Sequence, residues 1–267
     1  MQSGYMQILR RPMSSFYTGM CSYSNTHADV LSTVNNPAAL AQITNIATGV
    51  FAENSFLLKA TSRYTAALGI PTTNGSFGVT INYSGYQNFT ENQLGVTYAR
   101  SVGKKLDVGI QFNYYGYRIP GYFSASTIHS AIGAIAHVTD QFNIGLQVYN
   151  PVGGFISATK EKLMTVYAVG LGYDLGKHFY TGISVMVEEG APVYLNVSME
   201  YRFIKQFFIR AGISTATSMQ YAGVGTSWNK FSLHLTGSYH PQLGLSPGML
   251  LMMQLGNEKK ELVRDQE

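Results

Sequence analysis

Residues 193–202 read Val-Tyr-Leu-Asn-Val-Ser-Met-Glu-Tyr-Arg, and this stretch decides the fold. Its odd-numbered positions are large and apolar, while its even-numbered positions are mostly small or polar. A period of two residues places these two sets on opposite faces of a β-strand. The same alternation appears at residues 77–84, 108–114 and 142–148. The sequence therefore predicts a protein built from two-faced strands.

About fourteen such segments follow one another between residues 45 and 256. We place them near 46–56, 57–70, 76–87, 92–101, 106–118, 127–139, 141–150, 163–174, 178–188, 191–203, 206–215, 219–228, 231–240 and 247–256. Most have the length of about 9–11 residues, or slightly more, that a transmembrane β-strand needs. Tight turns alternate with longer loops, as in membrane barrels. We predict an all-β fold: a transmembrane antiparallel up-and-down β-barrel of about 14 strands, with both termini periplasmic.

Composition agrees with a membrane barrel. Only 12% of the 267 residues are charged, about half the share in soluble domains. No apolar run is long enough for a transmembrane helix. A soluble β-sandwich or lipocalin-like barrel is the alternative, but it would have to bury the apolar face of every strand. In lipid that face points outward instead. The lysines and arginines form no long run, so we expect no nucleic-acid partner.

Tyrosines near the segment ends predict aromatic girdles at the two membrane interfaces. The candidates are Tyr83, Tyr86, Tyr98, Tyr114, Tyr115, Tyr117, Tyr122, Tyr167, Tyr173, Tyr180, Tyr194, Tyr201 and Tyr239. The opposite, inward face of the strands is rich in Gly, Ser, Thr, Asn and Gln. We therefore expect a mainly polar lumen.

The first 44 residues lack this period. They contain Gly19-Met20 and, further on, Asn35-Asn36-Pro37-Ala38, in which Asn36-Pro37 favours a turn. Two interpretations are open: a periplasmic leader, or a plug that folds into the lumen. We divide the chain into a hatch (1–44), a barrel (45–256) and a charged periplasmic tail (257–267). Residues 1–20 lack the apolar core of a signal peptide, so whether one was removed stays open.

The order Leu9-Arg10-x-Pro12, Gly19-Met20, Asp29 and Asn36-Pro37-Ala38-x-Leu40 resembles the N-terminal signature of the PorV/PorQ group from Bacteroidota. That group is similar to the FadL superfamily of fourteen-stranded barrels. The resemblance implies that Gly19, Met20 and Asn35 to Ala38 form a lumenal hatch. It also implies an outer-membrane location and a role in type IX secretion. Cys21-Ser22-Tyr23 departs from the group, in which small residues usually follow Gly-Met.

Motifs of catalysis and cofactor binding are missing from the sequence. Six histidines are scattered, and none has the neighbours that a metal site needs. A barrel-embedded esterase or protease would need a Ser-His or Asp-His pair at the outer rim, for which Ser238 and His240 are the nearest candidates. We expect no enzyme, cofactor or metal. Glu200 and Arg202 share the polar face of one strand and are predicted to pair inside the lumen.

Two functions remain. The first is a closed scaffold of a protein secretion or outer-membrane assembly complex that docks other outer-membrane or periplasmic proteins. Its last strand is apolar on both faces, which makes Met249, Leu251 and Met253 candidates for contact with lipid or a partner. The alternative is a FadL-like passive transporter of small hydrophobic compounds.

Overall fold

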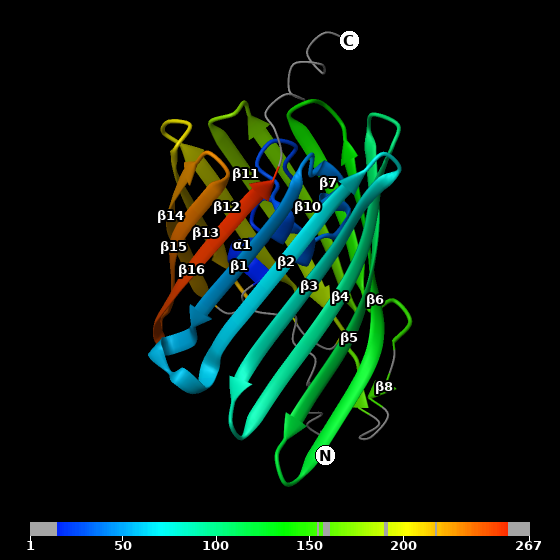
Figure 1. The fold of residues 1–267 in the computed structure, drawn as a ribbon, viewed down its shortest axis with the longest axis vertical. Coiled ribbons are helices and arrows are strands. Elements are labelled where there is room, and N and C mark those ends of the chain that lie inside the picture. Colours follow the sequence, from blue (N-terminus) through cyan, green and yellow to red (C-terminus); the bar gives the residue numbers. More distant parts are fainter. Residues whose placement is uncertain (1–14, 154, 157–160, 190–191, 217, 256–267) are drawn as a thin grey trace.

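A computed structural model describes residues 15–153, 155–156, 161–189, 192–216 and 218–255. Fourteen of its strands form one closed antiparallel barrel (Figure 1). The strands are β1 (Ile46–Asn54), β2 (Ser62–Thr72), β3 (Gly75–Tyr86), β4 (Phe89–Val102), β5 (Leu106–Ile119), β6 (Phe123–His137), β7 (Phe142–Tyr149), β10 (Val166–Leu175), β11 (Phe179–Glu188), β12 (Tyr194–Arg202), β13 (Phe207–Ser214), β14 (Met219–Trp228), β15 (Phe231–His240) and β16 (Gly244–Leu255). The predicted fold class is confirmed.

The barrel closes between its first and last strands, where Ile46 of β1 lies opposite Leu255 of β16. The remaining neighbours in the barrel are strands that follow one another in the chain, except that β7 pairs with β10. A short hairpin of β8 (Phe155–Ile156) and β9 (Glu161–Lys162) lies in the loop between those two strands. We call the end of the barrel with the tight turns the turn rim, and the other end the loop rim.

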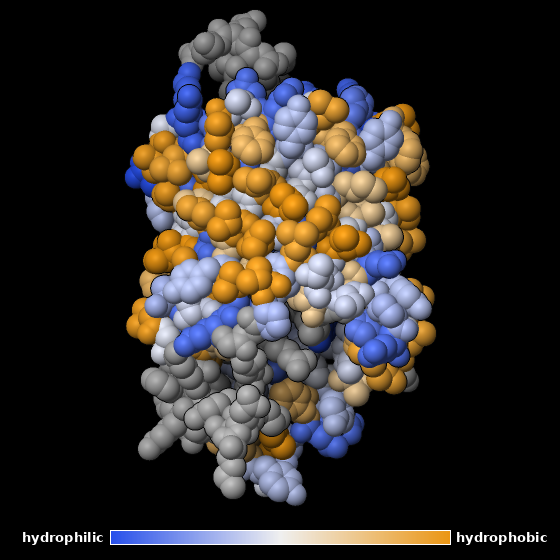
Figure 2. Space-filling model, turned by 180° about the vertical axis from the view of Figure 1, so that it is seen from behind, coloured by the Kyte–Doolittle hydropathy of each residue, from blue (hydrophilic) through white to orange (hydrophobic). Residues whose placement is uncertain are grey.

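The outer wall is apolar and the inner wall is mixed. In β10, residues at even positions from Val166 to Asp174 are buried, while those at odd positions are exposed. Exposed apolar residues of neighbouring strands merge into a belt on the face that Figure 2 shows, and the other strands of the barrel also carry exposed apolar residues. A surface of this kind is stable only against hydrocarbon, which is the physical reason for treating the chain as membrane-spanning. Among the described residues, no helix is both long and apolar enough to cross a membrane.

Two details of the prediction were wrong. Residues 55–61 do not extend β2 but form two 3-10 turns, η3 (Ser55–Leu57) and η4 (Lys59–Thr61). Phe56 and Leu57 both have a φ of 58°, a left-handed conformation that no strand accommodates. The girdle was also overestimated, because Tyr115, Tyr117 and Tyr180 point inward and are buried.

The N-terminal segment, residues 15–45, lies inside the turn-rim half of the barrel (Figure 1). It contains α1 (Ser15–Thr18) and two 3-10 helices, η1 (Val30–Val34) and η2 (Pro37–Gln42). Inward-facing glycines of the wall leave the room that it occupies. Those in contact range of the segment are Gly49, Gly69, Gly78, Gly109, Gly133, Gly145, Gly170, Gly172, Gly212 and Gly223. The inward-facing glycines therefore do more than line the lumen, because they make room for the N-terminal segment to pack against the wall.

We expect Gly109→Ala to destabilise the docked segment. A Cβ atom there would lie 2.5 Å from the Pro37 carbonyl carbon and 2.6 Å from the Ala38 nitrogen, so backbone has to move. Overpacking of this kind costs about 1–3 kcal/mol. Gly116→Ala in the same strand is the matched control, because its Cβ would meet nothing closer than 3.5 Å. Unfolding in detergent, followed by gel mobility, should show a lower denaturation midpoint for the first variant alone. Equal midpoints would mean that the segment does not press on β5.

The predicted tail (257–267) and the first 14 residues lie outside the described residues, so the periplasmic placement of both termini stays a prediction.

Candidate functional site

The inner segment is held by hydrogen bonds as well as by shape. Asn36 caps η2, because its Oδ1 accepts from the Ala38 backbone N–H at 3.0 Å and Pro37 occupies the first helical turn. Its Nδ2 also donates to the Leu146 carbonyl of β7 at 3.3 Å. Asn35 donates to the Gly19 carbonyl at 3.0 Å. The structure therefore brings Gly19 and the Asn-Pro-Ala motif into one folded unit against the wall.

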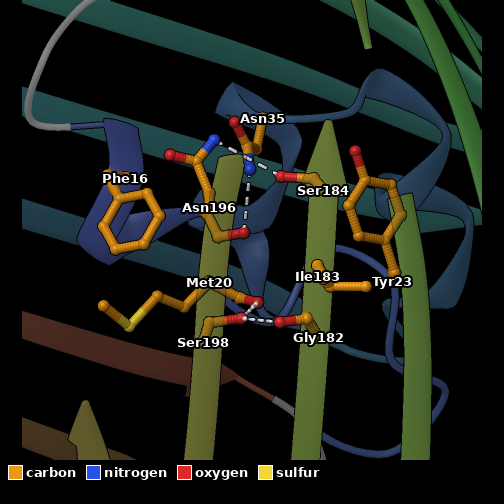
Figure 3. Close-up of a pocket in the computed structure, with 10 residues that line it drawn as sticks. Phe16, Met20, Tyr23, Asn35, Gly182, Ile183, Ser184, Asn196 and Ser198 are labelled. Carbon is orange, nitrogen blue, oxygen red and sulfur yellow. Dashed lines mark hydrogen bonds between the residues drawn. The ribbon is translucent and has the colours of Figure 1, made fainter. Parts of the chain in front are cut away.

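A small cavity separates this unit from β11 and β12 (Figure 3). Its volume is about 10 Å³, close to what the centre of one water molecule requires. Phe16, Met20 and Tyr23 line it from the segment, and Ser184 and Asn196 line it from the wall. Beside it, the Met20 carbonyl accepts a hydrogen bond from Ser198 at 3.0 Å. On this face of the segment, the contact with the wall leaves room for about one water molecule.

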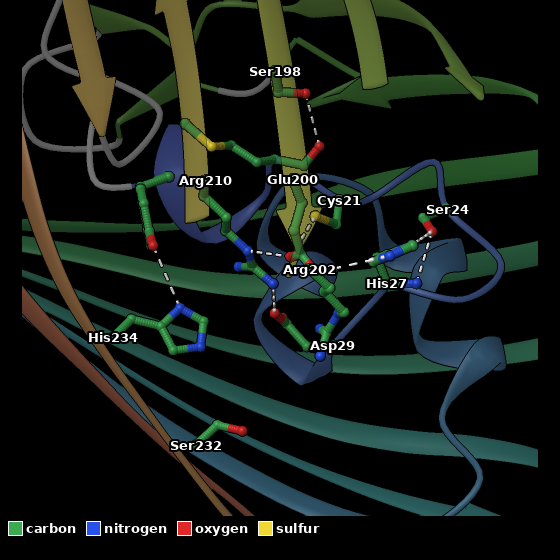
Figure 4. Close-up of polar contacts among 12 residues, drawn as sticks. Cys21, Ser24, His27, Asp29, Ser198, Glu200, Arg202, Arg210, Ser232 and His234 are labelled. Atoms are coloured by element: carbon green, nitrogen blue, oxygen red, sulfur yellow. Dashed lines mark hydrogen bonds and ion pairs between the residues drawn. The ribbon is translucent and has the colours of Figure 1, made fainter. Parts of the chain in front are cut away.

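Glu200 and Arg202 lie together in the lumen, as the shared face of β12 suggested. Arg202 Nε donates to Glu200 Oε1 at 2.8 Å. The stronger partner of Glu200 is Arg210 on β13, whose Nε lies 2.6 Å from Oε2 (Figure 4). Arg210 Nη2 also donates to Asp29 Oδ2 at 3.2 Å. Both Glu200 and Arg210 are fully buried, so this chain of charges links the inner segment to the wall.

Asp29 serves both the segment and the wall. Its Oδ1 caps η1 by accepting from the backbone N–H groups of Leu31 and Ser32 at 2.9 and 3.0 Å. Its Oδ2 is thereby left to face Arg210. A single carboxylate orders a helical turn and anchors it to β13.

A second contact joins His27 of the segment to Asp174 of β10, with 3.1 Å between Nδ1 and Oδ1. Ser24 and the Asn25 backbone N–H donate to the same carboxylate at 2.5 and 2.9 Å. At the end of the segment, Gln42 donates to Asp107 of β5, which also pairs with His137 at 2.8 Å. The segment is thus fastened at both its middle and its end.

Sequence reasoning missed most of this network. Arg210 lies on the inward face of β13 directly opposite Glu200, so strand pairing brings together charges that are ten residues apart. The alternation of apolar and polar residues over 206–215 places Arg210 on the inward face. This alternation is the one sequence feature that could have indicated its position in the lumen. His27 and Asp174 are 147 residues apart, Asp29 and Arg210 are 181 residues apart, and no local pattern joins either pair.

Cys21 lies at the centre of this cluster and is fully buried. Its Sγ faces Glu200 Oε2 at 3.5 Å. Burial raises the pKa of the Cys21 thiol well above its ordinary value, so the thiolate is scarce at neutral pH. As the only cysteine of the chain, it reports whether the segment remains docked.

The loop-rim half of the lumen differs from the expected polar lining. Here buried aromatic and apolar side chains from β5, β6, β7, β10, β11 and the loop before β10 form one cluster, which we call the mouth cluster. It consists of Tyr115, Tyr117, Ala125, Ala131, Tyr149, Leu163, Val166, Ala168 and Met186, with Phe89, Phe123 and Tyr194 packed against it. The difference follows from the tyrosines wrongly assigned to the girdle. Because Tyr114 faces outward, the adjacent Tyr115 has to face inward.

The last strand shows nothing that singles out a partner. Met249, Leu251 and Met253 lie on the outer face of β16 between β1 and β15, continuous with the apolar belt. The inward Leu250 is buried among residues of the inner segment and wall, and Met252 packs against that cluster. Lipid on one side and the segment on the other account for a strand that is apolar on both faces.

Within the described residues, no group of three or more His, Cys, Asp or Glu side chains converges as a metal site. Ser238 and His240 do not form a nucleophilic pair, because His240 Nδ1 accepts backbone N–H groups of Gln242 and Leu243 in the following turn.

No protein-family model matches the sequence, and no curated protein matches it. Solved structures do match the fold. The CymD monoaromatic hydrocarbon channel is 10% identical, with a TM-score of 0.67 over 91% of this chain and 97% of that one. The Ralstonia pickettii toluene transporter TbuX is 11% identical, with a TM-score of 0.61 over 85% and 94%. A Pseudomonas aeruginosa FadL homologue is 10% identical, with a TM-score of 0.57 over 88% and 96%.

These likenesses define a class of fold: the chain has the fourteen-stranded barrel of FadL-like proteins. At such identities they establish the fold alone. CymD is described as a channel and TbuX as a transporter, and none of these comparisons supports the narrower resemblance to the PorV/PorQ group.

Proposed function

We propose that this protein is a FadL-like channel of a bacterial outer membrane that passes small hydrophobic compounds. The observation that carries the proposal is the mouth cluster, which places aromatic and apolar side chains inside the barrel at the loop rim. Sites that bind apolar ligands are lined in this way, with few polar groups. The described fold is the one adopted by known hydrocarbon channels.

In this proposal the two halves of the lumen act in series. The mouth cluster takes an apolar solute out of water, which is favourable in proportion to the apolar area buried. Polar groups next to it, such as Gln93 and His129, contact Tyr149 and mark the inner limit of this surface. The inner segment then acts as the hatch of the turn-rim half. A solute leaves only when the segment yields along part of its contact with the wall.

The aromatic lining of this entry surface can be tested by substitution. Tyr117→Ala should lower the uptake of a monoaromatic probe such as toluene into proteoliposomes by about tenfold, because it removes an aromatic wall from the mouth cluster. Tyr114→Ala in the same strand is the matched control, since Tyr114 is 49% exposed on the lipid face and Tyr117 is 4% exposed. The proposal fails if both variants transport as the parent does.

A scaffold of the type IX secretion kind is the competing hypothesis. It predicts stoichiometric larger partners in a pull-down from native membranes in mild detergent. The channel predicts a lone barrel that moves apolar solutes. Recovery of such partners together with absent solute flux in liposomes would favour the scaffold and overturn the channel.

A further inference from the structure

The turn rim carries a concentration of positive charge. Six exposed basic residues lie on or beside four of its tight hairpins: Arg100, Lys104, Lys105, Lys177, Lys205 and Lys230. Among the described residues of this rim, Asp140 is the one exposed carboxylate, which leaves six positive charges against one negative charge. Asp107 and Asp174 lie near the same rim but face the lumen, where His137 and His27 engage them.

The loop rim has no such excess among the side chains that the structure describes. Its described charged side chains that reach solvent include the cations Arg63 and Arg118 and the carboxylates Glu91, Glu188 and Glu189. The net charge of the whole chain, +4, therefore does not describe its surface. Among the described side chains, positive charge is concentrated at the turn rim, and a surface of one sign attracts ions and molecules of the opposite sign.

Aromatic residues locate this charge relative to the membrane. Phe203, Phe207, Trp228 and Phe231 are exposed at the turn rim, and more than half of each side chain is accessible. Exposed aromatic side chains at a strand end mark the boundary between hydrocarbon and headgroups. Polar residues border the apolar belt at this end (Figure 2). Lys205 and Lys230 are next to these aromatic residues in the chain, so their ammonium groups reach the headgroup layer.

We propose that the turn rim binds the headgroups of anionic phospholipids in the adjacent leaflet. The basic residues are spread over four hairpins around the barrel rather than gathered on one side, which suits a surrounding lipid layer better than a single docked protein. The C-terminal segment 257–267 cannot supply the counter-charge, because it has four acidic and three basic residues. Each lysine near a membrane surface favours anionic lipid over zwitterionic lipid by several-fold. This inference is independent of what the barrel transports.

The chain contains its own reporter of the lipid at this rim. Trp228 is the only tryptophan, is 82% exposed, and lies two residues before Lys230. The Ser227 N–H donates to the Gln206 carbonyl, so the hairpin with Lys205 is adjacent. The protein is placed in phosphatidylcholine vesicles that contain a small fraction of brominated lipid, and the quenching of Trp228 fluorescence is measured. We expect the quenching constant of brominated phosphatidylglycerol to be about fivefold larger than that of brominated phosphatidylcholine. High salt should reduce this preference.

Two variants test the origin of the preference. Lys205→Gln combined with Lys230→Gln should bring the ratio of the two quenching constants close to one. Arg118→Gln on the opposite rim removes an exposed cation as a matched control and should leave the ratio unchanged. Equal quenching by the two brominated lipids in the parent protein overturns the proposal. A preference that survives the double substitution also overturns it, because the lysines would then not be its cause.

Discussion

Replacing Arg210 with alanine is expected to release the inner segment and expose Cys21. The guanidinium is buried between Glu200 and Asp29, so its loss leaves two carboxylates in the lumen without their main cation. Removing one partner of a buried ion pair typically costs about 3–5 kcal/mol. A shift of that size in the docking equilibrium raises the open population by about two to four orders of magnitude. Alkylation of Cys21 by a membrane-impermeant maleimide at neutral pH should accelerate accordingly.

Controls separate undocking from loss of the barrel. Arg202→Ala removes a partner of the same Glu200, but Arg202 is partly solvated, so its effect on alkylation should be smaller. Heat-modifiable gel mobility reports whether each barrel is closed. In Arg210→Met combined with Glu200→Gln, Asp29 is the one carboxylate of the two that is left without Arg210, so alkylation should fall part of the way back towards the parent rate. An intact Arg210→Ala barrel with parental alkylation would mean that other contacts hold the segment.

Deleting residues 1–44 is expected to convert a blocked barrel into a pore. The segment fills the space left by ten inward-facing glycines, and no other described element occupies that space. Conductance in planar bilayers should rise by about tenfold or more. Water and ions would then pass between walls that carry Glu200, Arg210 and Asp174, which gives a charged and hydrated path.

The deletion variant could fail to insert into the membrane, so a pair of milder substitutions tests the same idea. Tyr23 lies against Gly145 and Gly170, and Leu40 lies against Gly69 and Gly78. Trimming both side chains to alanine keeps the segment but opens its contact with the wall, so conductance should rise by a smaller amount. If the deletion variant inserts as a closed barrel and conducts no better than the parent, the hatch assignment is wrong.

The lumen contrasts an apolar cluster on one side of the loop rim with a polar, charged network in the turn-rim half. The mouth cluster suits an apolar solute, whereas the Asp29–Arg210–Glu200 chain does not. A charge network of this kind stabilises the native state little, because desolvation offsets much of the attraction. It does fix one position of the segment, since a shifted segment would strand buried charges. Solute entry and segment position are therefore governed by different residues and can be varied separately.

The strand pattern was readable because its cause is local. In residues 193–202 the faces alternate with every residue, and lipid on one side leaves little tolerance for polar residues there. The pairing of Glu200 with Arg202 follows from the same alternation. The position of β16 also follows, since an even number of antiparallel strands brings the last strand beside the first.

The sequence by itself determined the barrel, its strands and its outward apolar face, because a two-residue period and membrane thickness are properties of short segments. Only the tertiary structure decided that Asp29 meets Arg210, that His27 meets Asp174, and that Tyr115 and Tyr117 pack with Tyr149 and Met186 in one cluster. Those contacts join residues that are distant in the chain, or depend on the register in which a strand enters the wall. They arise when the sheet closes around the segment, and a period of two residues contains no information about that closure.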